Sequence, residues 1–188
     1  RLHIQVAGRA VRIPKELYDS KHKKTAVADY LLRNFAKQLE RHSFQAHGSG
    51  KSGIIQVTRC GQEVLERTAC EIDEKTGDVT VRFEVGFPAR GRTIQAGELV
   101  KILYQYLPAC VEKALYYKNM DRNAVKQAAE LSVDQEYIRE QLKKEGLVAF
   151  VADESILPRE SGVSQRPMKD AVPFASPDSM RITMKLPY

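Results

Sequence analysis

The stretch that decides the fold is VTVRFEV (residues 79–85), in which apolar and polar side chains alternate without a break. Because successive side chains of a β-strand point to opposite faces, the alternation predicts a strand with one face toward a core and one toward water. Residues 63–73 predict its antiparallel partner, and EKTGD (residues 74–78) supplies the turn between them. A β-hairpin is therefore the element from which the rest of the chain can be placed.

Outside this hairpin, apolar residues recur every three or four positions instead of every second position, and this spacing indicates helices. The predicted helices are residues 24–41, 96–107, 109–117 and 132–144. Pro108 starts or kinks the third of them. Ser132 is the expected N-cap of the fourth, and Gly146 follows its end.

Shorter β-prone runs complete the pattern, and they are residues 3–6, 10–13, 43–46, 54–58, 147–152 and 180–186. Residues 153–179 are rich in Pro, Ser and Gly and predict an extended loop. Strands and helices fall in blocks rather than in strict alternation. The sequence therefore predicts an α+β fold, with a mixed or antiparallel sheet and a block of helices in a single domain.

The excess of positive over negative charge is confined to the first quarter of the chain. The 188 residues include 30 Lys and Arg against 24 Asp and Glu, a net charge of +6. Residues 1–51 hold 11 basic and 4 acidic side chains, whereas residues 52–188 hold 19 and 20. Such asymmetry favours an anionic partner, such as nucleic acid, nucleotide phosphate or an acidic surface. A solvated basic face is the alternative.

Several classes of protein are excluded by motif and composition. No window approaches about 18 consecutive apolar residues, so no membrane partner is expected. Three cysteines without a CxxC spacing and four histidines without HExxH predict neither a disulfide framework nor a metal site. Free thiols favour a reducing compartment, and we expect a cytoplasmic location. GxSxG, GxGxxG and a Cys–His catalytic set are also absent, so no catalytic residue is predicted.

The run GSGKSG (residues 48–53) imitates a phosphate-binding P-loop but fails its pattern. GxxxxGK[ST] requires Gly at position 45, where this chain has Gln45, and it requires a helix directly after the Ser. Here the strand-like run IIQV follows Gly53. A weaker prediction survives: amides of Gly48, Gly50 and Gly53 form an anion-binding nest with Lys51, Ser49 and Ser52. A flexible hairpin loop is the equal alternative.

Two further basic segments are candidate phosphate contacts. Arg90 and Arg92 flank Gly91, and two guanidiniums can hold phosphate oxygens bidentately. Arg159 lies in the loop after Asp153, where a carboxylate and a guanidinium could form the edge of a ligand site. A surface turn and local pairing are the alternatives. Tyrosines near lysines on the middle helices could stack on bases, although helical spacing is more typical of core residues.

Six separated strings together resemble one known family. They are VRIP (11–14) with ELY (16–18), ADYLLR (28–33), GSGKSG (48–53), GQEVLERT (61–68), VGFPARGR (85–92), and GLVAFVAD (146–153) running into ILPR (156–159). Their order and spacing are similar to those in the N-terminal domain of the predicted ATPases of the ABC class. That family includes a kinetoplastid mitochondrial RNA-editing factor that binds RNA.

This resemblance implies a longer parent with an ABC-type core, which would carry its own P-loop and bind ATP and magnesium. It implies that residues 1–188 are an accessory fragment, with 155–188 forming a loop and strand that lead to a core missing from this chain. No cofactor is expected in the fragment itself.

Our leading hypothesis from the sequence is an RNA-binding accessory domain of an ABC-class ATPase, with single-stranded RNA as the partner. The expected phosphate and nucleic-acid contacts are Gly48, Ser49, Gly50, Lys51, Ser52, Gly53, Arg90, Arg92 and Arg159. One alternative is a docking domain without a ligand, which positions the ATPase core of the same chain or pairs it in a homodimer. Another is a small phosphate or nucleotide site in residues 48–53.

Overall fold

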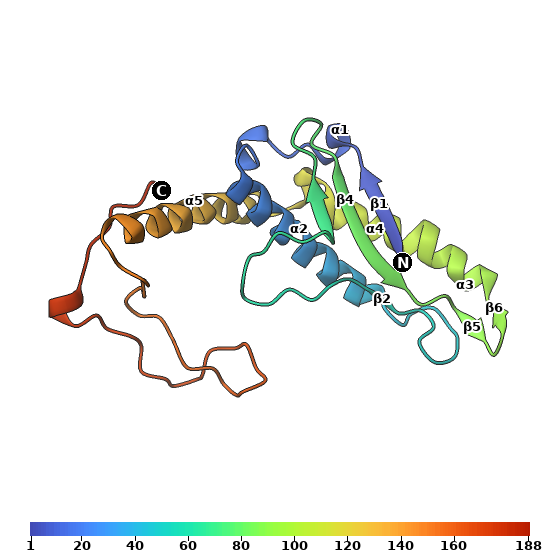
Figure 1. Ribbon diagram of the computed structural model, residues 1–188. Helices are drawn as coiled ribbons and strands as arrows, with labels where there is room; N and C mark the ends of the chain where they lie inside the picture. Colours follow the sequence, from blue (N-terminus) through green and yellow to red (C-terminus); the bar gives the residue numbers. More distant parts are fainter. The chain divides into compact units, whose positions relative to one another are not determined.

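The strand β4 (Val79–Val85) is the axis of the sheet in the computed structural model, which describes residues 1–188. The strand β1 (Leu2–Val6) pairs along one of its edges, as Figure 1 shows. Two shorter strands share the other edge: β3 (Cys70–Ile72) pairs with the first half of β4, and β2 (Ile55–Gln56) pairs with its end. Every pairing is antiparallel, which confirms the α+β class and the predicted turn between β3 and β4. The first arm of the predicted hairpin is shorter than expected, because only Cys70–Ile72 of residues 63–73 forms a strand.

Alternation along β4 places its side chains as the sequence predicts. Val79, Val81 and Phe83 are buried, whereas Arg82 and Glu84 are exposed. The exposed side chains are paired across strands. Arg82 forms an ion pair with Glu71 of β3 at 2.5 Å, and Glu84 accepts from Arg1 at 3.1 Å. Exposed pairs of this kind contribute little to stability, so the sheet is held mainly by its apolar face.

The turn between β3 and β4 is built on carboxylates. Asp73 Oδ1 accepts hydrogen bonds from the backbone N–H groups of Thr76 at 2.7 Å and Lys75 at 2.9 Å, and these bonds lower the pKa of Asp73. Gly77 takes the left-handed conformation, with φ at +72°. Asp78 then accepts from the backbone N–H of Gly8 at 2.8 Å, which lowers the pKa of Asp78 and ties the turn to the end of β1.

The helix α2 (Lys21–His42) contributes more buried apolar side chains to the core than any other element. Its buried side chains contact β2 and β3, and another part of its surface packs against α4 (Leu107–Leu115), so α2 lies between the sheet and a second helix. Phe35 is fully buried and meets Phe83 edge to face, with ring centroids 5.6 Å apart. The buried apolar residues of α2 are Ala26, Val27, Leu31, Leu32, Phe35 and Leu39.

The two helices expected on either side of Pro108 form one continuous helical segment. The helix α3 (Ala96–Lys101) runs through a π-helical turn at Ile102–Tyr106 into α4. Within that turn the N–H of Leu107 donates to the carbonyl of Ile102, five residues earlier. Pro108 has no N–H to donate and crowds the preceding turn of a regular helix. The wider π-helical turn makes room for its ring, so the helix continues where a break was expected.

Two predicted strands in the first half of the chain are wrong. Of residues 10–13, the first two belong to the short helix α1 (Gly8–Val11) and the other two have no regular structure, and residues 43–46 form a turn rather than a strand. In that turn Phe44 has φ at +63° and donates its N–H to the carbonyl of Gly53 at 2.8 Å. A run of four residues indicates only a local preference for β-structure, and here hydrogen bonds to distant parts of the chain override that preference.

The chain divides into two compact units, Arg1–Ala129 and Glu130–Tyr188. The helix α5 (Arg122–Lys144) begins in the first and continues in the second. Its start lies ten residues before the predicted N-cap at Ser132, because Asp121 accepts the N–H groups of Ala124 and Val125, at 3.1 Å each. Ser132 is a buried residue inside the helix. No helix in the structure is long and apolar enough to cross a membrane.

The second unit contains no strand, which corrects two further predictions. Residues 147–152 and 180–186 were expected to form strands, yet both are irregular, and the side chain of Val148 is fully exposed. Neither run has a neighbouring strand to satisfy its backbone groups. The loop predicted at residues 153–179 is confirmed, apart from a short 3₁₀ turn at Asp178–Met180. It is cross-linked by local hydrogen bonds such as Glu154 N–H to the Phe174 carbonyl at 2.8 Å.

We predict that Phe35→Ala lowers the free energy of unfolding by about 3–5 kcal/mol, because it leaves a cavity between α2 and β4. Urea denaturation of the 188-residue chain measures the change. Phe44→Ala is the matched control: Phe44 is 63% exposed, and its replacement should change the free energy by less than about 0.5 kcal/mol. Equal losses for the two variants would contradict this account of the core.

Candidate functional site

The glycine-rich loop Gly48–Gly53 is fastened to the segment that follows β4. The N–H of Ser49 donates to the carbonyl of Ala89 at 2.8 Å. The Ser52 hydroxyl donates to the Ser49 carbonyl at 2.6 Å and accepts from the N–H of Ala89 at 3.0 Å. The N–H of Gly53 donates to the carbonyl of Gly86 at 2.8 Å. The loop is therefore an ordered turn that packs against residues 86–89.

These bonds use several of the donors that a phosphate nest would need. The amides of Ser49, Ser52 and Gly53 all donate to backbone carbonyls, and the Ser49 hydroxyl donates to Ala89 at 3.1 Å. Ser52 is buried. Gly50, with φ at +61°, and Lys51 are exposed at the tip of the loop. The loop's remaining capacity for an anion therefore lies at the exposed residues Gly48, Gly50 and Lys51.

Close packing explains two glycines near this loop. A Cβ on Gly86 would overlap the carbonyl oxygen of Lys51, and a Cβ on Gly53 would lie 2.7 Å from that of Ala46. Gly53 also has φ at +73°. Both positions need glycine so that two backbones can approach. The strand β2 follows the loop, so a helix N-terminus that could hold phosphates is not present there, as the sequence predicts.

Arg90 and Arg92 lie on a small hairpin beside the loop. The strands β5 (Ala89–Arg90) and β6 (Thr93–Ile94) form this hairpin, and Gly91 takes φ at +58° in its turn. Both arginines are exposed and form no ion pair, and the same holds for Lys51. Because Ala89 holds the loop and precedes Arg90 directly, the structure brings these predicted contacts into one region, which we call the basic tip (residues 48–53 and 89–92).

Arg159 belongs to the second unit and is not part of the basic tip. It is exposed, and it makes an isolated antiparallel bridge with Pro167. Its neighbours are held by the Met168 N–H, which donates to the Pro158 carbonyl at 2.9 Å, and by the Glu160 N–H, which donates to that of Arg166 at 2.9 Å. The bridge gives Arg159 a fixed place in a local turn.

The base of the basic tip is anchored to α3 by Glu98. Its carboxylate accepts from the Lys101 ammonium at 2.7 Å and from the backbone N–H of His47 at 3.1 Å. The Lys101 bond, followed by the His47 bond, lowers the pKa of Glu98, so this side chain stays ionised. Lys101 is therefore neutralised by Glu98, whereas Lys51, Arg90 and Arg92 in the basic tip form no ion pair.

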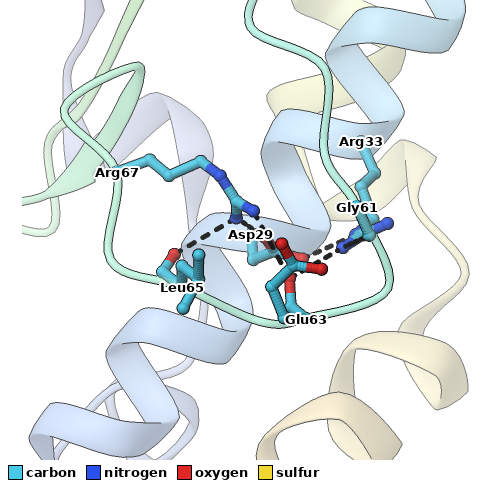
Figure 2. Close-up of polar contacts among 6 residues, drawn as sticks. All are labelled: Asp29, Arg33, Gly61, Glu63, Leu65 and Arg67. Atoms are coloured by element: carbon cyan, nitrogen blue, oxygen red, sulfur yellow. Dashed lines mark hydrogen bonds and ion pairs between the residues drawn. The ribbon is translucent and has the colours of Figure 1, made fainter.

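A buried carboxylate on α2 organises the longest irregular segment of the first unit, and sequence analysis missed it. Asp29 accepts from Arg33 Nε at 2.6 Å through Oδ2 and from Arg67 Nη1 through Oδ1, as Figure 2 shows. Arg33 also donates to the carbonyl of Gly61 at 2.7 Å, and Arg67 donates to that of Leu65 at 3.4 Å. The Asp29 side chain is only 2% exposed.

The Asp29 cluster (Asp29, Arg33 and Arg67) therefore pins residues 57–69, which run between β2 and β3 without regular structure. Both arginines also donate to the Glu63 carbonyl, at 3.3 and 3.4 Å. The spacing of Asp29 and Arg33 on one helix face was a signal in the sequence. No local pattern pointed to Arg67, which is 38 residues away from Asp29.

The cysteines and histidines do not form a metal centre. No group of three or more His, Cys, Asp or Glu side chains is placed to hold a metal ion. Cys70 and Cys110 are buried, and burial raises the pKa of Cys70 to about 12 and that of Cys110 to about 11. Cys60 is half-buried beside the Asp29 cluster; burial and then the Asp29 carboxylate raise its pKa.

An antiparallel sheet covered by α2, with the exposed basic tip after its central strand, defines a small α+β domain. Residues 1–118 match the family model described as the N-terminal region of ATPase of the ABC class. The chain therefore belongs to this family, as the resemblance implied. Residues 121–188 match a model described as the P-loop domain of an ABC ATPase. The search of curated proteins found no match.

The second match starts next to the first residue of α5 and includes the whole irregular segment after it. Residues 121–188 contain no GxxxxGK[ST] pattern, so the residues of a phosphate-binding P-loop are not among those matched. The two matches meet close to the N-terminus of α5.

We predict that Asp29→Ala lowers the free energy of unfolding by about 3 kcal/mol or more, because Arg67 is left buried without its partner. The loop at residues 57–69 should also become sensitive to limited proteolysis, since both of its side-chain anchors are lost. Asp19→Ala is the control, because Asp19 pairs with Lys23 at the surface at 3.1 Å and should cost less than about 1 kcal/mol. An unchanged proteolysis pattern in Asp29→Ala would contradict the role of the cluster.

We also predict that Cys60 is the one thiol that reacts readily in the folded chain at pH 8. It should react more slowly than free cysteine, because its raised pKa leaves less thiolate. Titration with a chromogenic disulfide reagent, before and after denaturation, measures this. Cys60→Ser should abolish the native reaction, whereas Cys110→Ser should leave it unchanged. A second thiol reacting at the same rate in the folded chain would refute the assignment.

Proposed function

We propose that this chain is an RNA-binding accessory region of an ABC-class ATPase and that its basic tip contacts the phosphate backbone. The observation that supports this proposal is the convergence of Lys51, Arg90 and Arg92. All three are exposed, and none forms an ion pair. Cations held on an ordered loop and a hairpin lose little entropy when they bind phosphate, which favours affinity.

The other residues expected at the site have different parts in this proposal. Ser49 and Ser52 position the loop through Ala89, and the glycines permit its tight path. Lys51 is then the loop's main phosphate contact, with the exposed Gly50 beside it. Arg159 contributes a further contact from the second unit. Single-stranded RNA as the ligand, a cytoplasmic location, and ATP with magnesium in a longer parent remain proposals carried by the family resemblance.

We predict that the affinity of the 188-residue chain for oligo(U) falls steeply between about 50 and 200 mM salt. The triple variant Lys51→Ala/Arg90→Ala/Arg92→Ala should reduce the slope of log K against log salt by about 2, since each single-strand phosphate contact contributes about 0.7. Fluorescence anisotropy with labelled oligo(U) measures both quantities.

The control for that variant removes the same charge elsewhere, in Lys143→Ala/Lys144→Ala/Lys169→Ala. These three lysines are exposed and lie in the second unit. Its slope should stay close to that of the unmodified chain. If both triple variants bind alike, or if binding does not depend on salt, the basic tip is not a phosphate-binding surface.

A docking function is the second candidate, and exposed apolar side chains in the second unit favour it. Val148, Val163 and Val172 are 101%, 99% and 87% exposed, which is unusual for three valines in one segment. In this alternative they pack on the ATPase core or on a second copy. Absence of oligo(U) binding, together with a dimer in sedimentation velocity that Val148→Ser/Val163→Ser/Val172→Ser dissociates, would favour docking over RNA binding.

A further inference from the structure

A groove of about 1050 Å³ lies beside α2, separate from the residues of the basic tip. One wall is the helix face that carries Arg33 and Lys37. The other is formed by residues 43–44, 54–57, 59 and 60, which include β2 and the first part of the segment pinned by the Asp29 cluster. The volume is sufficient for a nucleotide-sized ligand.

Positive charge predominates in this groove. Its lining includes Arg33, Lys37 and Arg59, against the single carboxylate of Glu40. Arg33 is already committed to Asp29, but Lys37 and Arg59 are exposed and form no ion pair. Two free cations therefore face the groove from opposite walls, one from the helix and one from the irregular segment.

An aromatic side chain lies among these cations. Phe44 lines the groove, and its side chain is 63% exposed. Its backbone has φ at +63°, a conformation that is rare and strained for a bulky residue. The turn is held by the Phe44 N–H bond to Gly53 at 2.8 Å and by the Ser43 hydroxyl, which accepts from the N–H of Ile55 at 3.1 Å. Strain of this kind persists where the surroundings fix it, and it concentrates at ligand sites.

We infer that this groove is the base-binding part of the nucleic-acid site, in which Phe44 stacks on an unpaired base and Lys37 and Arg59 contact the flanking phosphates. The inference rests on the proposed RNA binding and adds a location and a strand requirement to it. A base must be unpaired to stack on a side chain, so the ligand is single-stranded. Phe44 is bonded to Gly53, the last residue of the glycine-rich loop, so a strand leaving the groove continues toward Lys51.

The chain contains no tryptophan, which gives a direct test of stacking. Phe44→Trp places a unique fluorophore in the groove, and its emission should be quenched when unlabelled oligo(U) saturates the protein. Tyr116→Trp is the matched control: Tyr116 is a half-buried aromatic with Lys118 5.7 Å from its ring, outside the groove. Its emission should not change.

Affinity and protection give independent readings on the same 188-residue chain. Phe44→Ala should weaken oligo(U) binding about tenfold or more but leave binding of an abasic oligonucleotide unchanged, because only the stacked base is lost. Lys37→Ala/Arg59→Ala should lower the salt slope by about 1.4. Oligo(U) should also slow alkylation of Cys60, which lines the groove.

The outcomes separate this inference from the function on which it rests. If the unmodified chain binds oligo(U) with the expected salt slope, yet Phe44→Trp is not quenched and Cys60 is not protected, the groove is not the base site and the basic tip alone binds RNA. Equal affinity for duplex RNA and oligo(U) would also overturn the inference. If the unmodified chain binds no oligonucleotide, the proposed function and the inference fail together.

Discussion

The carboxylate of Asp29 is the interaction on which the arrangement of the first unit depends. It is buried within α2 and bound by two guanidiniums, one from its own helix and one from the segment before β3. Burying a charge is costly unless it is paired and hydrogen-bonded, and here both oxygens have partners. The arginines in turn satisfy the carbonyls of Gly61, Glu63 and Leu65. The Asp29 carboxylate thus fixes residues 57–69, a long segment that contains no strand or helix of its own.

The ion pairs of Asp29 also shape one wall of the groove beside α2. Because β2 and β3 share one edge of β4, the chain must leave that edge after Gln56 and return to it at Cys70. Residues 57–69 make this excursion, and their first part forms a wall of the groove beside α2. Apolar packing of α2 on the sheet would not by itself set the path of these residues. The ion pairs hold the excursion at a defined distance from the helix, so Arg59 and Cys60 remain at the surface.

The parts of the fold that the sequence could predict are those governed by local periodicity. Residues 79–85 alternate as a half-buried strand should, and residues 24–41 repeat as an amphipathic helix should. Failures occur where distant contacts decide the structure. The turn at Phe44 depends on Gly53 and Ile55, and the strand expected at 147–152 has no partner. Similarly, the sequence identified the loop at 48–53 as a candidate site. It could not show that both serine hydroxyls hydrogen-bond to the backbone of Ala89, 37 residues after Ser52.

The structure also shows which of the basic side chains in residues 1–51 form ion pairs and which do not. The cations toward the start of α2 are already paired, Lys23 with Asp19 and Lys24 with Glu74. Toward the end of the helix, Lys37 is unpaired, and Lys51 on the loop beyond is unpaired as well. Within α2 and the loop that follows it, the unpaired cations therefore lie toward the end of the helix, beside the exposed ring of Phe44, whereas Arg9, Arg12 and Lys15 are unpaired near α1. In the proposed site, a phosphate chain drawn to that end would meet an aromatic face within the same groove, and a solvated basic surface alone would not supply that face.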